Sequence, residues 1–205
     1  MSIIGPVRRG WPATLQEGRV GLRPIRRSDR TTWLAIRGRN AAWLAPWEAT
    51  PPGDSGRTMS FTAMVRSLHK QARQGTVLPF VVTYDGALVG QVTVGGITWG
   101  SLASAHIGYW VDQRVAGRGV MPTAVALVTD HCFRVLGLHR VEVNIRPENA
   151  ASLRVVEKLG FREEGLRVAF LHIAGAWRDH RSFALTTEEV PQGLLARWRA
   201  TQQPR

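Results

Sequence analysis

A short stretch from Arg114 to Gly119, with the sequence Arg-Val-Ala-Gly-Arg-Gly, constrains the fold of this chain more than any other. The residues before it, 105–111, are rich in β-branched and aromatic side chains and predict a strand. After it, apolar residues recur at helical spacing from Val120 to Val135. A strand, a glycine-bearing loop and a helix N-terminus therefore follow one another directly.

This succession predicts an anion site. Unpaired N–H groups and the positive end of the helix dipole converge at such a loop, and a phosphate fits there. Gly117 and Gly119 have no Cβ, so a ligand can approach the backbone and positive φ values are permitted. The loop is not a Walker loop and lacks the third glycine of a dinucleotide fingerprint. Taken alone, it fits a plain tight turn equally well.

Composition describes one globular domain. The 205 residues are 44% hydrophobic and 20% charged, enough for a sizeable core. No apolar run approaches the roughly 18 residues that span a bilayer, so we expect no membrane association. Residues 1–10 carry Arg8 and Arg9 with no apolar segment behind them and do not predict a signal peptide. The single Cys132 excludes an internal disulfide, fits a core position better than a nucleophile, and favours a cytoplasmic location.

The chain is strongly basic. It has 27 Lys+Arg against 15 Asp+Glu, a net charge of +12. Such a charge favours anionic partners through salt-sensitive contacts, and association with RNA or the ribosome through a basic surface is one possibility. Arginine enrichment also arises from genome composition, and the sequence leaves both causes open.

The remaining patterns predict an α+β fold. We expect a strand at 19–26, a helix after Ser28-Asp29, a breaker-rich loop at 44–55 and a helix at 55–74. Strands at 78–84 and 88–98 join at Asp85-Gly86, and a third strand ends at Val111. After the central helix come a strand at 139–146, a short helix closed by Gly160, a hairpin over 161–185 and a helix from Pro191.

Four motifs in this order resemble the GNAT superfamily of acetyl-CoA-dependent N-acetyltransferases. The glycine loop is similar to its Gln/Arg-x-x-Gly-x-Gly/Ala motif, and segments 149–152 and 158–161 are similar to its Asn-x-x-Ser and Lys-Leu-Gly-Phe motifs. Segments 108–111 and 175–180 are similar to the RimJ/RimL branch, which acetylates N-terminal amines of ribosomal proteins.

The resemblance covers about residues 19–186. It implies a GNAT-type fold with one mixed, mostly antiparallel sheet of about seven strands, flanked by helices and splayed between its fourth and fifth strands. The GNAT domain is expected over 1–188, and a C-terminal helix and polar tail over 189–205.

The resemblance also implies acetyl-CoA as cosubstrate, and no metal. The pyrophosphate is expected on the N–H groups of Val115, Gly117, Gly119 and Val120, and the pantetheine arm beside the backbone of Val111. The full expected set is Val111, Arg114, Val115, Ala116, Gly117, Arg118, Gly119, Val120, Asn149 and Ser152. The two arginines equally fit a solvated surface, and Asn149 equally fits a helix N-cap.

Three residues are candidates for proton transfer. The resemblance implies Ser152 as the donor to the leaving thiolate, because this branch places a hydroxyl there near the thioester sulfur, although a first-turn capping hydroxyl fits as well. The tyrosine that many family members carry four residues further on is replaced by Val156, which favours Ser152 or a water as the donor. His106 and Glu142 are the candidate general bases, although a lone strand histidine is often structural. A water chain can also carry the proton of the amine away.

The acceptor is expected to contact Trp47, Glu48, Tyr109 and Asp179, although the pair Asp179 and His180 also fits a hairpin brace. The resemblance favours a protein N-terminal α-amine, whose reference pKa near 8 requires only a mild base. A small amine such as a polyamine or aminoglycoside would need an acidic pocket, which a +12 chain has few carboxylates to build. A non-catalytic acyl-CoA- or RNA-binding module is the third possibility. A monomer and a homodimer both fit.

Overall fold

The computed structural model describes residues 10–53 and 59–202. Most of the segment considered for a signal peptide, and the start of the helix expected at 55–74, lie outside these ranges. The strands are β1 (Leu15–Glu17), β2 (Val20–Pro24), β3 (Leu78–Tyr84), β4 (Ala87–Thr98), β5 (Ser104–Val111), β6 (Arg140–Ile145), β7 (Arg162–Ile173) and β8 (Ala176–Thr186). The helices are α2 (Arg30–Arg39), α3 (Ala41–Leu44), α4 (Phe61–Gln74), α5 (Val120–His131), α6 (Ala150–Leu159) and α7 (Leu194–Gln202).

The strands form one sheet in the order β1-β2-β3-β4-β5-β6-β8-β7. Every neighbouring pair is antiparallel except β5 and β6, so the prediction of a mixed, mostly antiparallel sheet is confirmed. The sheet has eight strands rather than about seven. The additional strand is β1, whose three residues are too few to show an alternating pattern.

The parallel pair separates after three residues. Ser104–His106 lie opposite Arg140–Glu142, and no pairing between the two strands follows. This is the expected splay, which lies between the fourth and fifth strands when β1 is not counted. From Ile107 to Val111, β5 hydrogen-bonds only to β4, so its other edge is open to a ligand.

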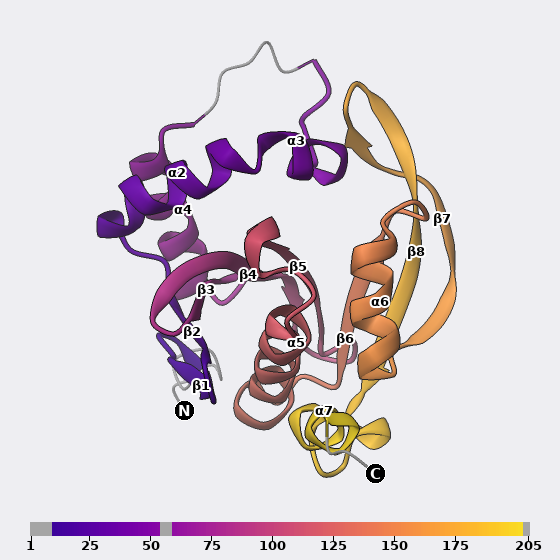
Figure 1. The fold of residues 1–205 in the computed structure, drawn as a ribbon. Helices are drawn as coiled ribbons and strands as arrows, with labels where there is room; N and C mark the ends of the chain where they lie inside the picture. Colours follow the sequence, from indigo (N-terminus) through magenta and orange to yellow (C-terminus); the bar gives the residue numbers. More distant parts are fainter. Residues whose placement is uncertain (1–9, 54–58, 203–205) are drawn as a thin grey trace.

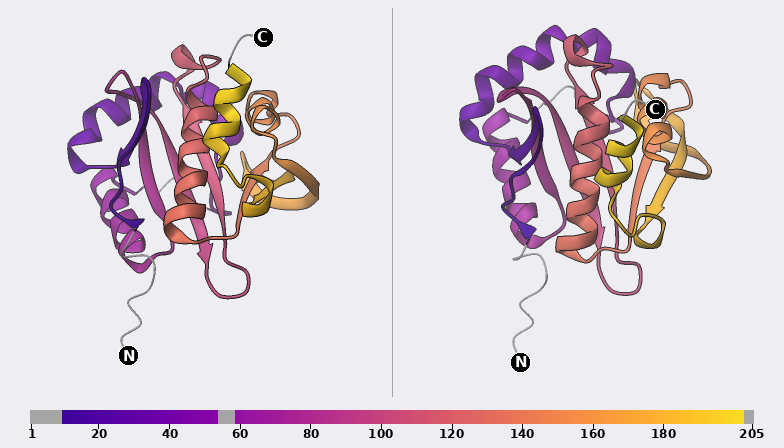
Figure 2. Two further views of the ribbon diagram at one scale, coloured as in Figure 1. Left: turned by 90° about the horizontal axis from the view of Figure 1, so that it is seen from below. Right: turned by 60° about the horizontal axis from the view of Figure 1, so that its bottom comes forward.

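Helices cover both faces of the sheet, as Figures 1 and 2 show. The main core packs α5, α6 and α7 against one face, with Phe80, Val92 and Ile107 among the buried strand residues. A smaller core packs α2 and α4 against the other face through Ile36, Phe61 and Val65. The splay therefore opens between two helical layers.

Turn and cap signals in the sequence locate most element ends. The hairpin turn at Asp85-Gly86 and the left-handed C-cap at Gly160 (φ +71°) are confirmed. The loop expected at 44–55 is partly helical, because α3 ends at Leu44 and a 3-10 turn, Ala45–Trp47, follows it.

The C-terminal helix begins at Leu194, three residues later than predicted from Pro191. The side chain of Asp130 on α5 accepts hydrogen bonds from the N–H groups of Leu194 (2.6 Å) and Leu195 (3.1 Å). These two bonds fix the start of the helix. Leu194 and Trp198 are buried in the main core, which makes α7 part of the same folded unit as the sheet.

Candidate active site

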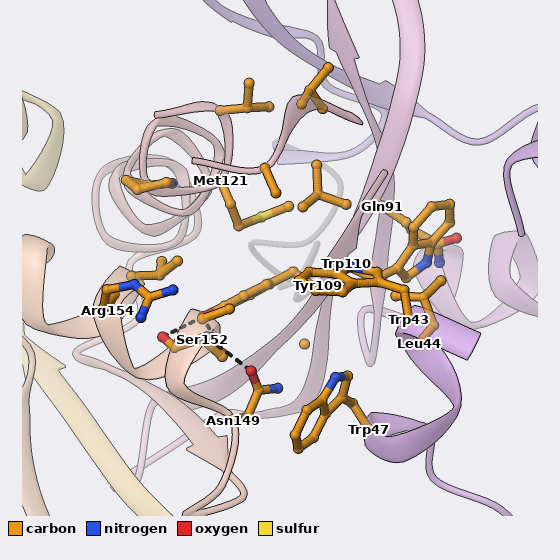
Figure 3. A pocket seen from close by; sticks show the side chains of 18 of the residues that line it. Trp43, Leu44, Trp47, Gln91, Tyr109, Trp110, Met121, Asn149, Ser152 and Arg154 are labelled. Carbon is orange, nitrogen blue, oxygen red and sulfur yellow. Dashed lines mark hydrogen bonds between the residues drawn. The ribbon is translucent and has the colours of Figure 1, made fainter. Parts of the chain in front are cut away.

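A cavity of about 570 Å³ lies at the splay. Its walls come from α2 and α3, the ends of β4 and β5, the glycine loop with the start of α5, and α6. Figure 3 shows Trp43 and Trp47 on one side of this cavity, Met121 and Arg154 on the other, and Tyr109 reaching Ser152 between them. The cavity therefore extends from the predicted anion site to the loop that is predicted to contact the acceptor.

The glycine loop has the backbone conformation expected of an anion site, and we call residues 117–121 the cradle. Gly117 (φ +79°) and Gly119 (φ +75°) adopt the left-handed conformation. Within the described ranges, the N–H groups from Gly117 to Met121 donate no hydrogen bond, and Pro122 has none to donate. Consecutive unpaired amides at the N-terminus of a buried helix suit a pyrophosphate.

One of the expected amides is not available. The Val115 N–H donates to the carbonyl of Asp112 (3.0 Å) and the Ala116 N–H to that of Gln113 (3.2 Å), because these residues close a 3-10 turn, Gln113–Val115. Val115 and Ala116 line the cavity, but their N–H groups are already hydrogen-bonded within the turn and cannot bind a phosphate. The cradle therefore begins at Gly117, two residues later than predicted.

The C-terminal helix supports this loop. Trp198 Nε1 donates to Thr123 Oγ1 (2.8 Å), which donates to the Gly119 carbonyl (2.9 Å). The indole lies 3.6 Å from the point where a Cβ on Gly119 would stand. The conformation of the cradle thus depends on α7, near the other end of the chain.

Asn149 and Ser152 open α6 beside the open edge of β5. Asn149 Oδ1 accepts the Ser152 N–H (3.0 Å) and caps the helix, while its NH₂ group remains for a ligand. Ser152 Oγ lies 2.7 Å from the hydroxyl of Tyr109, which comes from β5 across the splay. Burial raises the pKa of Tyr109, and the hydrogen bond to Ser152 offsets only part of this rise, so the phenol stays protonated at physiological pH.

The expected acceptor residues Trp47 and Glu48 line the cavity, together with Trp43. Glu48 forms an ion pair with Arg37, whose pKa is lowered by burial. The Arg146 guanidinium lies 5.5 Å from the centre of the Trp47 ring and donates to the Pro46 carbonyl (2.7 Å). The tryptophan-bearing segment is therefore fixed over the cavity.

The candidate bases His106 and Glu142 do not line the cavity. His106 lies three residues before Tyr109 on β5 and therefore points to the other face, where its ring packs over Gly95 and Gly96. Burial lowers the pKa of His106. Glu142 accepts from Arg140 (2.8 Å) and Arg167 (2.7 Å). The structure thus separates both groups from Ser152.

Three further expected contacts lie outside the cavity walls. Asp179 Oδ1 accepts the N–H of Ala169 (2.8 Å), a left-handed residue (φ +49°) where the β7–β8 register shifts, so Asp179 braces the hairpin. Arg114 and Arg118 are exposed beside the cradle and do not line the cavity.

Sequence reasoning missed Arg154 and Lys158, which line the cavity from α6. Their spacing of four places them on one helix face, and that spacing was the available signal. No group of three or more metal-ligating side chains occurs in the described ranges, and no described helix is long and apolar enough to cross a bilayer.

Comparisons with known proteins agree on one family. A sequence model described as an acetyltransferase (GNAT) domain matches residues 19–162. The structure of Mycobacterium smegmatis RimJ in complex with CoA-disulfide is 42% identical with a TM-score of 0.89, and the match covers 94% of this chain and 96% of RimJ. The ribosomal protein uS5-alanine N-acetyltransferase of Escherichia coli is 27% identical over 169 residues, 80% of this chain and 87% of that protein. The probable N-acetyltransferase YjcK of Bacillus subtilis is 41% identical over 108 residues, which span 53% of this chain and only 60% of YjcK.

Proposed function

The chain belongs to the GNAT acetyltransferase family, and from this premise we propose that it acetylates the N-terminal α-amine of a protein, with a ribosomal protein as acceptor. Membership makes the chain an acyl-CoA-dependent N-acetyltransferase with acetyl-CoA as cosubstrate. The identity of the acceptor and the roles of individual residues are the proposed part. Such an acceptor also places the enzyme in the cytoplasm.

The acceptor side of the cavity carries this proposal. Within residues 10–53 and 59–202, Glu48 is the only carboxylate that lines the cavity, and it is already paired with Arg37. A polyamine or aminoglycoside carries several cationic amines and would need several carboxylates. A protein N-terminus presents one α-amine followed by an uncharged peptide backbone, which suit one carboxylate beside Trp43 and Trp47. The similarity to RimJ and to the uS5-alanine acetyltransferase supports the same acceptor class.

The cavity also fits acetyl-CoA. The unpaired amides from Gly117 to Met121 would hold the pyrophosphate, with the cations of Arg154 and Lys158 nearby. The open edge of β5 up to Val111 would pair with the amides of the pantetheine arm as an added strand would. The NH₂ group of Asn149 is a further donor at the same place.

The proposed reaction is direct attack within a ternary complex. The neutral amine forms a C–N bond with the acetyl carbonyl carbon, and the C–S bond of the thioester breaks. Ser152 gives its hydroxyl proton to the leaving thiolate and regains one proton that the attacking nitrogen, cationic after the C–N bond forms, releases through water. The hydroxyl of Tyr109 lies 2.7 Å from Ser152 Oγ, and a hydrogen bond donated by the phenol keeps the serine proton directed at the sulfur. No histidine lines the cavity, and the α-ammonium group of the acceptor, with a reference pKa near 8, gives up its first proton to water before the attack.

Thiol release from acetyl-CoA tests the proposal. The acceptors are peptides that begin with Ala, Ser or Thr, the same peptides with a blocked N-terminus, spermidine and an aminoglycoside. We expect turnover only on the free peptides, with loss of turnover in Ser152→Ala and retention in Ser101→Ala, an exposed serine in a distant turn. Turnover confined to the small amines would refute the proposed acceptor.

A further inference from the structure

The positive charge of the chain is unevenly distributed. Residues 18–84 contain 11 Lys+Arg and 3 Asp+Glu, a net +8 of the total +12. Residues 140–190 contain eight of each kind and are neutral. A composition bias acting on the whole chain would spread the charge evenly. The excess therefore belongs to one part of the fold, which includes β2, α2, α3 and α4.

Ion pairing separates the cations of this part into two groups. Arg19, Arg23, Arg37 and Arg39 each pair with a carboxylate. Six others are exposed and form no ion pair within the described ranges, and we call them the basic surface: Arg26, Arg27, Arg30, Arg66, Lys70 and Arg73.

The fold brings the two halves of the basic surface together. Arg26, Arg27 and Arg30 lie at the 3-10 turn Arg27–Asp29 and the start of α2. Helix α4 packs against this turn, with His69 Nε2 2.7 Å from the Ile25 carbonyl. Figure 1 shows α2 and α4 next to each other.

The three cations of α4 follow one helix face. Arg66, Lys70 and Arg73 recur at steps of four and three, over about 10 Å of helix length. The opposite face of α4, with Phe61 and Val65, is buried in the smaller core. The cations therefore form a stripe on the solvent side of α4, opposite the face that packs into the smaller core.

Asp29, which lies between Arg27 and Arg30 in the sequence, is already bound. Asp29 is buried, accepts from both terminal nitrogens of Arg23 (2.7 and 2.9 Å), and also accepts the N–H of Arg26 (2.7 Å). It does not neutralise the exposed cations, so their field extends into solvent.

We propose that the basic surface binds the phosphate backbone of RNA. Five of its six cations are arginines, which bind phosphate through two parallel N–H donors. A row of closely spaced cations matches the regular, dense charge of a nucleic-acid backbone. Helix α2 leads from this surface into α3, which lines the acceptor side of the cavity with Trp43. RNA is chosen over other polyanions because a ribosomal protein presents its N-terminus beside RNA, and this choice rests on the proposed function.

A labelled RNA duplex of about 20 base pairs tests the proposal, with affinity measured from about 50 to 200 mM salt. If most of the six cations contact phosphates, log K falls against log salt with a slope of about −4 to −5. In the triple variant Arg66→Gln, Lys70→Gln, Arg73→Gln the slope should be less steep by about two to three, because each lost phosphate contact reduces its magnitude by roughly 0.9. The control Arg162→Gln, Arg181→Gln, Arg199→Gln removes the same net charge from exposed ion pairs and should bind as the parent does.

Three results would overturn the proposal: no RNA binding at about 50 mM salt, an equal loss in both triple variants, or equal affinity for polyglutamate, which would indicate an acidic protein partner. Thiol release on free peptides should be the same in the parent and in both triple variants, because none of these residues lines the cavity. Failure of RNA binding with peptide turnover intact is thus distinct from failure of the proposed function.

Discussion

The hydrogen bond between Tyr109 and Ser152 makes the most specific prediction about catalysis. Tyr109→Phe removes the phenol hydroxyl and keeps the ring in the cavity wall. The lost bond is neutral and 2.7 Å long, and such bonds are worth about 0.5–1.5 kcal/mol net. If the bond acts mainly in the transition state, kcat falls about 2- to 13-fold. The KM for acetyl-CoA should not change, because the cradle amides lie on another element.

A double-mutant cycle separates this role from simple packing. Ser152→Ala should lower kcat at least about 100-fold, the smaller end of what a general acid contributes. Because Tyr109 acts through Ser152, the double variant should be no slower than Ser152→Ala alone. Tyr84→Phe is the matched control, since Tyr84 is the only other tyrosine of the chain and does not line the cavity.

The pH profile gives an independent readout. Burial raises the pKa of Tyr109 above its ordinary value of 10.0, so the phenol should stay protonated and kcat should not decline below that pH. Two results would refute the proposed role of Tyr109 in orienting Ser152. One is a kcat in the double variant that is lowered by the product of the two single-variant effects, and the other is a wild-type kcat in Tyr109→Phe.

Other predictions concern the cradle, the fold and the acceptor. Gly117→Ala puts a side chain at φ +79° at a strain of about 1–2 kcal/mol, so the KM for acetyl-CoA should rise several-fold, whereas Gly100→Ala (φ +75°) in a distant turn should leave that KM unchanged. Burial alone would raise the pKa of Asp112, but hydrogen bonds led by Arg39 hold it below its ordinary value. The stability from this carboxylate is therefore present above about pH 4 and lost as pH falls through the lower folded pKa, so the urea midpoint of Asp112→Asn should fall less on acidification than that of the wild type. Glu48→Gln should raise the KM for the acceptor peptide and leave the KM for acetyl-CoA unchanged in steady-state assays.

Local signals predicted much of the fold. Periodicity located the long strands and helices, and the positive-φ turns at Asp85-Gly86 and Gly160 carry their usual residues. The three residues of β1 gave too little pattern, and the start of α7 depends on Asp130, 64 residues earlier in the chain. The first was missed because the strand is short, and the second because its determinant lies far away in the sequence.

Most of the site could also be predicted from local sequence. The cradle follows from its own sequence, apart from the amides of Val115 and Ala116, which the 3-10 turn uses. His106 was selected for its chemical type, but it lies where β5 is still paired with β6, opposite Glu142, before the splay opens. Arg154 was available from helical spacing alone.

The position of Tyr109 also bears on whether the chain is catalytic. The tyrosine of many relatives is replaced by Val156, which suggested a fold retained without chemistry. Val156 is fully buried in the main core, so that position has no access to the cavity in this chain. A phenol instead reaches Ser152 from β5, on the opposite side of the splay and 43 residues away in sequence. The missing tyrosine therefore does not leave the cavity without a protonated phenol, and of the two observations that allowed the non-catalytic interpretation only the basic charge is left.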